Sequence, residues 1–176
     1  MSPPGRPKGE YRSEHRPVAP VLVFGWGNLS RGDDALGPML VERLRAEWAL
    51  DRRFEFLDDY QLQVEHALDL EGRERVLFVD ASQQGDAPFG VAQLRARRGA
   101  GISTHAISPE AVMQVYCDLL GRAPPPCTLL AIRGASFELG EAPRPQALVH
   151  LEAAQSWAQV WLSHGAAAPQ PEPHHA

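Results

Sequence analysis

The chain has 176 residues, a formal net charge of −5 and 44% hydrophobic residues, enough apolar content for the core of one compact domain. With 22% charged residues and no dense Lys/Arg stripe, it matches neither a disordered chain nor a protein built around a nucleic-acid groove. No apolar run reaches the roughly 20 residues that a membrane-spanning helix needs, and residues 1–17 lack the apolar stretch of a signal peptide. We therefore expect a cytoplasmic protein with no membrane or nucleic-acid partner.

The two ends of the chain differ in composition from the rest. Residues 1–17 are Pro-rich, basic and polar, and residues 164–176 are rich in Pro and Ala. Both are predicted to be disordered tails, which leaves residues 18–163 as a single α/β domain. The two cysteines, Cys117 and Cys127, are too few for a disulfide framework or a four-ligand zinc site, so we expect both to be reduced.

The first half of the domain begins with a buried strand. Residues 18–24 form a short apolar, β-branched run that ends at a Gly-rich turn, which is typical of a strand buried on both faces. Apolar positions at helical spacing follow from Leu36 towards Trp48 and predict a helix. Residues 54–57 are a second short strand, and residues 62–70 permit a helix without demanding one.

The second half repeats the alternation. Residues 76–79 are a fully apolar strand that ends on Asp80, and residues 91–94 can form another strand. A helix start follows at residues 108–110, where Ser can cap, Pro suits the first helical position and Glu favours the positive end. Residues 128–132 predict a further strand, and residues 148–161 a last helix.

Strands that alternate with helices predict a three-layer α/β/α sandwich. Its sheet is expected to be twisted, mostly parallel and about five strands wide, with helices on both faces. Ligands of such sheets bind beyond the carboxyl ends of the strands, which directs attention to the residues after 24, 57, 79 and 94.

The Gly-rich turn at residues 25–34 first suggests a dinucleotide site. Ser30 stands where the third glycine belongs, the helix begins late, and no Gly-Lys-Ser/Thr phosphate loop is present. Nucleotide binding is therefore disfavoured. Asn28 is expected to stabilise the turn, since Asn side chains hydrogen-bond locally.

Asp33 and Asp34 lie between this turn and the helix. One of them is expected to cap the helix, and the other would then point into the crevice near Asp80. His105, in the segment before the next helix, must pass the same edge. Two carboxylates and one imidazole suit a divalent ion such as nickel, zinc or iron, and three protein ligands leave the site open to substrate. We take Asp34 as the first candidate and Asp33 as the second.

The remaining histidines make weaker candidates. Four lie in or near the tails, and His66 and His150 lie in predicted helices without partners. The Gly-x-Ser-x-Gly elbow of serine hydrolases and the His-Glu-x-x-His helix of zinc proteases are absent from the sequence.

Three motifs in order resemble the hydrogenase maturation endopeptidase family, which trims the C-terminus of nickel-iron hydrogenase large subunits. They are Gly25-x-Gly27-Asn28 with residues 32–38 (Gly-Asp-Asp-Ala-x-Gly-Pro), the strand 76–80, and residues 103–105 (Ser-Thr-His). Residues 59–68 and 133–140 are similar to the branch that serves soluble, NAD-coupled hydrogenases. The resemblance covers roughly residues 20–162.

The resemblance implies an aspartyl-type endopeptidase, expected to be monomeric, that removes the C-terminal extension of a large-subunit precursor after nickel insertion. The nickel arrives with the precursor, and Asp34, Asp80 and His105 complete its coordination and carry catalysis. Gly25, Gly27, Asp59 and Gln61 are assigned to substrate binding. Many relatives have Asp-Gly-Gly-Thr where this chain has Asp-Asp-Tyr-Gln at residues 58–61, which suggests a narrow partner range.

Two other classes of function stay open from the sequence. The same three residues could sense nickel on the large subunit without hydrolysis, as an escort module. Alternatively, the fold could host a small-molecule hydrolase or phosphorylase, because fold alone does not fix function. The group that removes the proton from the attacking water is also open.

Overall fold

The computed structural model describes residues 17–99 and 107–164. His105 and most of both predicted tails lie outside the described residues. The elements in chain order are β1 (Val21–Trp26), η1 (Gly32–Ala35), α1 (Leu36–Glu47), β2 (Phe54–Asp59), η2 (Val64–Leu70), β3 (Arg75–Ser82), β4 (Phe89–Gln93), α2 (Pro109–Leu120), β5 (Cys127–Arg133) and α3 (Pro145–Ser163).

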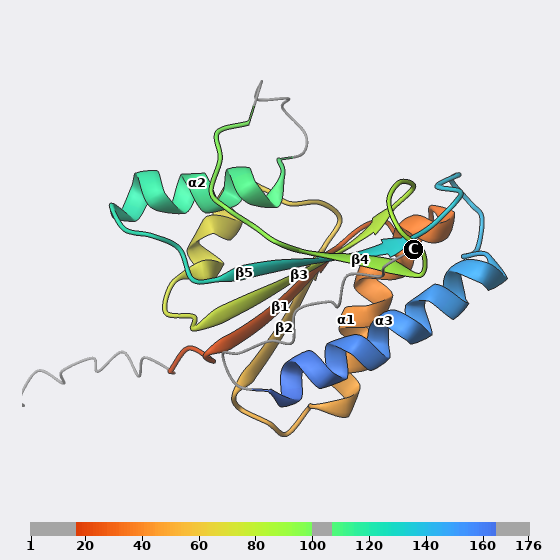
Figure 1. Ribbon diagram of the computed structural model, residues 1–176, viewed down its shortest axis with the longest axis horizontal. Coiled ribbons are helices and arrows are strands. Elements are labelled where there is room, and N and C mark those ends of the chain that lie inside the picture. Colours follow the sequence, from red (N-terminus) through yellow and green to blue (C-terminus); the bar gives the residue numbers. More distant parts are fainter. Residues whose placement is uncertain (1–16, 100–106, 165–176) are drawn as a thin grey trace, which may run out of the picture.

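The five strands form one sheet in the order β2-β1-β3-β5-β4. The first four are parallel, and β4 pairs antiparallel with β5 at the edge. Helices α1 and α3 cover one face and α2 with η2 covers the other (Figure 1). The predicted three-layer, mostly parallel α/β sandwich is confirmed.

The side chains of β1 alternate between the two faces of the sheet, which shows why the central strands are apolar throughout. Val21 and Val23 pack into the core under α1 and α3, whereas Leu22 and Phe24 pack into the core under α2 and η2. All four side chains are buried. Because both faces of the sheet are covered, a central strand has no position where a polar side chain reaches water, and the run of apolar residues follows.

Several boundaries differ from the predictions. Strand β1 begins at Val21 rather than at residue 18, since Pro20 has no N–H for a ladder, and it continues through Gly25 to Trp26. Residues 64–70 form a 3-10 helix. Helix α2 starts as predicted: the Ser108 hydroxyl accepts a hydrogen bond from the Ala111 N–H at 3.2 Å. Gly121 ends it at φ 64°, a conformation that glycine adopts without strain.

Both cysteines are free thiols, as expected from their number. Burial raises the pKa of the Cys127 thiol to about 12, so this group stays protonated and is no nucleophile. None of the helices among the described residues is long and apolar enough to cross a membrane.

Candidate functional site at the carboxyl edge of the sheet

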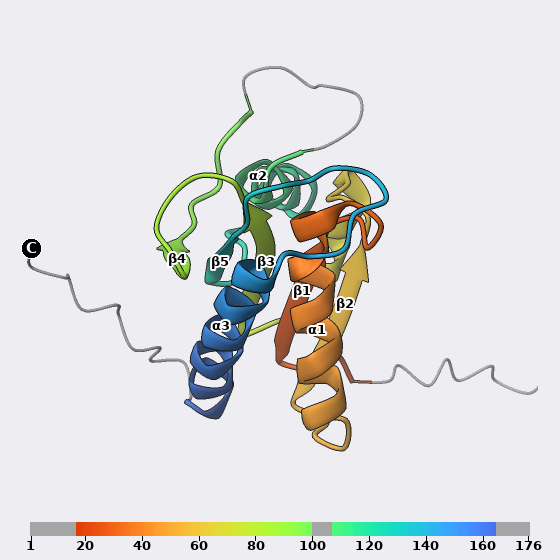
Figure 2. The same cartoon turned by 90° about the vertical axis from the view of Figure 1, so that its right-hand side faces the viewer.

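The parallel strands β1, β2, β3 and β5 all end at one edge of the sheet, which faces the viewer in Figure 2. The 3-10 helix η1 lies at this edge, and the loop between β5 and α3 runs across it (Figure 2). Asp34 of η1, Asp80 of β3 and Asp59 of β2 are therefore brought to the same side of the molecule. This is the edge at which parallel α/β sheets bind ligands.

Asp33 does not cap the helix, and that prediction was wrong for both acids: neither η1 nor α1 has a side-chain cap. The Asp33 side chain is fully buried and accepts three backbone N–H bonds from the β5–α3 loop. Its Oδ2 accepts from Ala135 at 2.7 Å and Ser136 at 3.2 Å, and its Oδ1 accepts from Arg144 at 2.7 Å. Both of its carboxylate oxygens are thus bound to this loop, so Asp33 is a structural clamp on it.

Asp34 is the acid that stays partly accessible. Its Oδ2 accepts a hydrogen bond from the Asn28 N–H at 3.0 Å, which ties it to the turn after β1. Asn28 stabilises that turn as predicted, because its Oδ1 accepts from the Ser30 N–H at 2.8 Å. Of the two neighbouring acids, Asp34 is the one free to meet a ligand.

Asp80 carries the strongest electrostatic signature at this edge. The pKa of its carboxyl is raised to about 7, chiefly by burial and in part by the negative charge of Asp34. Hydrogen bonding from the Ala81 N–H, at 2.9 Å, and from the Trp26 side chain opposes the shift. Among the described residues no Lys, Arg or His pairs with Asp34 or Asp80. Two neighbouring carboxylates without a cation are suited to bind one, or to exchange a proton near neutral pH.

The glycines of the first motif are explained by packing inside the protein. A Cβ on Gly27 would lie 2.0 Å from the backbone oxygen of Asp34, and Gly27 has φ 144°. A Cβ on Gly25 would lie 2.6 Å from Val41 and 2.9 Å from the oxygen of Gly37. These contacts allow η1 and α1 to lie directly against β1, which positions Asp34. Their assignment to substrate binding stays a prediction.

Asp59 and Gln61 lie just after the neighbouring strand β2. The Asp59 carboxylate accepts from the Tyr60 N–H at 2.6 Å and lies 3.2 Å from Nε2 of His66. Gln61 is half-buried in the bend that follows. Asp59 is therefore oriented by its surroundings, and a contact of either residue with substrate stays a prediction.

His66, which was expected to lack partners, contacts Asp59 at this edge. Its Nδ1 accepts from the Gln63 N–H at 2.9 Å, so in the neutral ring the proton sits on Nε2, which faces Asp59. Its ring also lies 4.6 Å, centroid to centroid, from Phe24. The signal available in the sequence was the spacing of Gln63 and His66, three residues apart at a helix start.

The predicted third metal ligand, His105, lies outside the described residues. Within residues 17–99 and 107–164, no three His, Cys, Asp or Glu side chains are grouped closely enough to hold a metal ion. The structure thus brings Asp34 and Asp80 together at one edge, and the completion of a three-ligand set by His105 stays a prediction.

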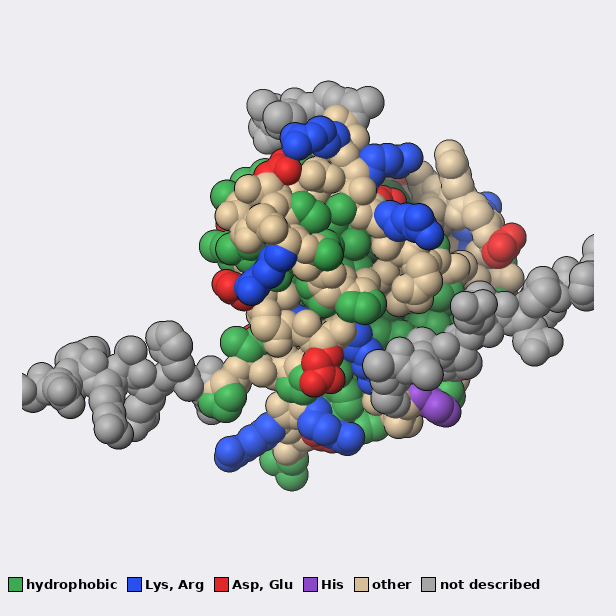
Figure 3. Space-filling model, turned by 60° about the vertical axis from the view of Figure 1, so that its left-hand side comes forward, with side chains coloured by type: hydrophobic (Ala, Val, Ile, Leu, Met, Phe, Trp, Pro, Cys, Tyr) green, Lys and Arg blue, Asp and Glu red, His purple; other side chains and the backbone are tan. Residues whose placement is uncertain are grey.

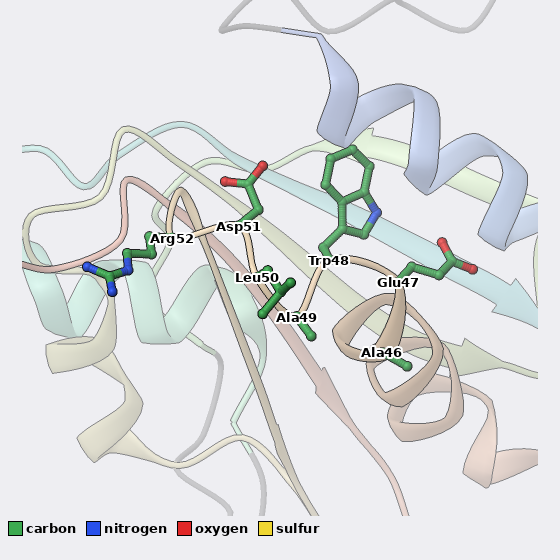
Figure 4. Close-up of a pocket in the computed structure, with 7 residues that line it drawn as sticks. All are labelled: Ala46, Glu47, Trp48, Ala49, Leu50, Asp51 and Arg52. Atoms are coloured by element: carbon green, nitrogen blue, oxygen red, sulfur yellow. The ribbon is translucent and has the colours of Figure 1, made fainter.

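Two hollows of the surface lie away from this edge. One, of about 620 Å³, is lined by the residues 46–52 that connect α1 to β2, and Figure 4 shows that their side chains splay outward instead of converging. The other, of about 130 Å³, lies at the amino ends of β1 and β3 beside Arg53, Arg75 and His164. Figure 3 brings this end forward and shows basic side chains scattered between apolar and acidic ones. The side chains of the first hollow do not converge as in a small-molecule site, and in the second Arg75 and Arg53 already bind backbone oxygens of α3 and Asp51.

Comparison with known proteins connects the chain to one group. It is 28% identical over 138 residues to the hydrogenase 2 maturation protease of Escherichia coli, covering 73% of this chain and 83% of that protein. No family model matches the chain.

Solved structures agree on the fold. The NiFe hydrogenase maturation protease HycI from Thermococcus kodakarensis superposes with a TM-score of 0.62 at 24% identity, over 80% of this chain and 90% of that one. The hydrogenase maturating endopeptidase HybD from E. coli gives the same TM-score and identity, over 81% and 90%. An endopeptidase from E. coli gives 0.59 at 26% identity, over 81% and 90%. The relative and the solved structures named here are all hydrogenase maturation proteases or endopeptidases.

Proposed function

We propose that this chain is a hydrogenase maturation endopeptidase, which hydrolyses a peptide bond to remove the C-terminal extension of a nickel-iron hydrogenase large-subunit precursor. The relatives named above are maturation proteases and endopeptidases. The single observation that carries the proposal is the pair Asp34 and Asp80 at the edge of the sheet, held without a cation among the described residues.

The unpaired carboxylates give the proposal its chemistry. Burying a carboxylate without a counter-charge costs free energy. The pKa of Asp80 is raised because burial destabilises its charged form. A cation delivered by the substrate would remove the repulsion between Asp34 and Asp80. In this proposal the cation is the nickel of the precursor, part of the substrate, and His105 is its third ligand from this chain. Cleavage then follows nickel insertion.

The same pair can serve the hydrolysis itself. In the nickel-loaded complex the cation holds the Asp80 carboxylate ionised, and an oxygen of this carboxylate that does not contact the nickel can accept a proton from the attacking water. Asp80 is therefore our candidate for the group that takes the proton of the attacking water. Asp34, fixed by the Asn28 N–H, is our candidate for the ligand that positions the substrate.

The relatives favour a protein substrate over a small molecule, because they are named as hydrogenase maturation proteases. We further propose that the protein acts as a cytoplasmic monomer in the branch serving soluble, NAD-coupled hydrogenases.

The test is cleavage of purified nickel-loaded precursor, followed as loss of a C-terminal peptide on a denaturing gel and by mass spectrometry. We expect the wild-type chain to cut this precursor and to leave the metal-free precursor intact. Asp34→Ala, Asp80→Asn and His105→Ala are expected to lower the rate by about 100-fold or more while circular dichroism stays native.

Glu152→Gln is the matched control, because Glu152 is an exposed acid on α3, and it should cut at the wild-type rate. Rapid cleavage of metal-free precursor would contradict the role of nickel. Nickel-dependent binding without any cleavage would favour the escort function, and full activity of the Asp34 variant would remove that residue from the site.

A further inference from the structure

Three large apolar side chains stand exposed around the candidate site. Leu29, Tyr60 and Leu139 are 62%, 73% and 75% exposed, and each follows a different strand of the sheet. Leu29 lies in the turn after β1, Tyr60 in the bend after β2, and Leu139 in the β5–α3 loop. We call these three residues the apolar rim.

Backbone hydrogen bonds hold the members of the apolar rim close to one another. The Gly140 N–H donates to the Ser30 oxygen at 2.7 Å, which places Leu139 and Leu29 on adjoining stretches of chain. The Gly27 N–H donates to the Asp59 oxygen at 3.1 Å, which places Tyr60 beside the same turn. That turn also holds Asp34 through Asn28. The loops that carry the apolar rim therefore adjoin the turn that holds Asp34.

The rim is also fixed in position before any partner arrives. The loop that carries Leu139 is clamped by the three N–H bonds to Asp33, and the Ser136 hydroxyl donates to Glu141 at 3.0 Å. Two further backbone bonds, from Gly32 to Glu141 and from Asp33 to Ser136, join this loop to η1. A preformed surface loses little conformational entropy when it binds, which favours its use as a docking site.

We propose that the apolar rim docks apolar side chains of the precursor's C-terminal extension, an inference that rests on the proposed function. A polypeptide must cross this edge to bring its scissile bond to Asp34 and Asp80. Single exposed apolar residues are ordinary on a protein surface, but a group on three loops around one site marks an interface. Docking of the extension would make recognition depend on the segment that is removed.

The test compares steady-state cleavage of nickel-loaded precursor by the wild-type chain and by the triple variant Leu29→Ser, Tyr60→Ser, Leu139→Ser. We expect KM to rise about 10-fold or more and kcat to change by less than about twofold, because the rim binds substrate without touching the reacting atoms. The matched control is Leu50→Ser with Leu119→Ser, since these leucines are 98% and 63% exposed at other places on the surface. Its KM should equal that of the wild type.

Binding of the mature large subunit, which lacks the extension, separates the possible contacts. We expect wild-type and triple-variant chains to bind it equally weakly. Tight binding by the wild type that the triple variant loses would assign the rim to the body of the partner and overturn our proposal. Single serine variants, each checked by circular dichroism, replace the triple variant if it does not fold.

The two proposals fail in different ways. A wild-type chain that never cuts nickel-loaded precursor refutes the proposed function, and the docking inference falls with it. A wild-type chain that cuts, together with a folded triple variant of unchanged KM, refutes the docking inference alone.

Discussion

Strand β3 carries a charged side chain near each end, buried in the case of Arg75 and half-buried in the case of Asp80, and the surroundings of the two differ. At its amino end the Arg75 guanidinium donates to the backbone oxygens of Trp161 at 2.7 Å and Leu162 at 3.3 Å. It also stacks 4.0 Å above the Trp161 ring. Near its carboxyl end, Asp80 accepts hydrogen bonds from the Ala81 N–H and from the Trp26 side chain. The negative charge of Asp34 repels its carboxylate.

Burial disfavours both charges: it lowers the pKa of Arg75 and raises the pKa of Asp80. The difference lies in the compensation. Arg75 meets the negative end of helix α3 and satisfies its last carbonyls, so its charge stabilises the fold. Asp80 meets another acid, so its charge destabilises the free protein unless the carboxyl takes up a proton or a cation neutralises it. A buried charge with partners is structural, and one without them indicates a site.

The largest effect on stability is expected from a change of Arg75, at the amino end of β3. Arg75→Ala should lower the free energy of unfolding by about 4 kcal/mol, because two helix carbonyls lose their donor and Trp161 loses its packing partner. Urea unfolding measures this loss. Arg53→Ala, which removes an exposed guanidinium paired with Asp51, should give no measurable change. Cleavage by Arg75→Ala should persist below its melting temperature, and its loss there would place Arg75 in the function.

Asp33 is a carboxylate at the carboxyl edge of the sheet whose charge is stabilised by three backbone N–H groups. Asp33→Asn should cost about 3 kcal/mol of stability, since the amide nitrogen cannot accept the N–H bonds that one oxygen now receives. Because the β5–α3 loop carries Leu139, KM for the precursor should rise as well. Thermal unfolding and steady-state cleavage test both effects. A variant as stable as the wild type would show that these bonds are replaceable.

The protein is expected to gain stability when the charge of Asp80 is removed. The pKa of Asp80 is about 7 in the folded protein and has its ordinary value of 3.8 in the unfolded chain. The folded protein therefore binds more protons between these values, and the wild type loses stability as pH rises from about 4 to 7. Asp80→Asn does not titrate, so at pH 8 it should be more stable than the wild type by roughly 2 kcal/mol.

Urea unfolding of the metal-free chain at pH 4 and pH 8 measures this difference. It should be small at pH 4, where both side chains are neutral, and reach its full size above pH 7. A difference that shrinks as pH rises would mean that Asp80 has a cationic partner, and the contrast with Arg75 would disappear.

Much of the fold was predictable because it depends on local patterns. Apolar runs at residues 18–24 and 76–79 indicated central strands, and Ser108 with Pro109 marked the start of α2. The carboxyl-edge rule then placed Asp34 and Asp80 on one side of the sheet. The partners of His66 were missed, because Asp59 reaches it only once β2 and η2 are packed.

The sequence by itself determined the layers of the fold, the order of its strands and helices and the set of acids that follow the strands, because hydrophobic period and turn chemistry act over a few residues. Which of two adjacent acids faces the site was decided only by the tertiary structure. Asp33 turns inward because amides 102 to 111 residues away need an acceptor, and Asp34 stays partly accessible. The raised pKa of Asp80 is likewise tertiary, because it requires burial under neighbouring elements.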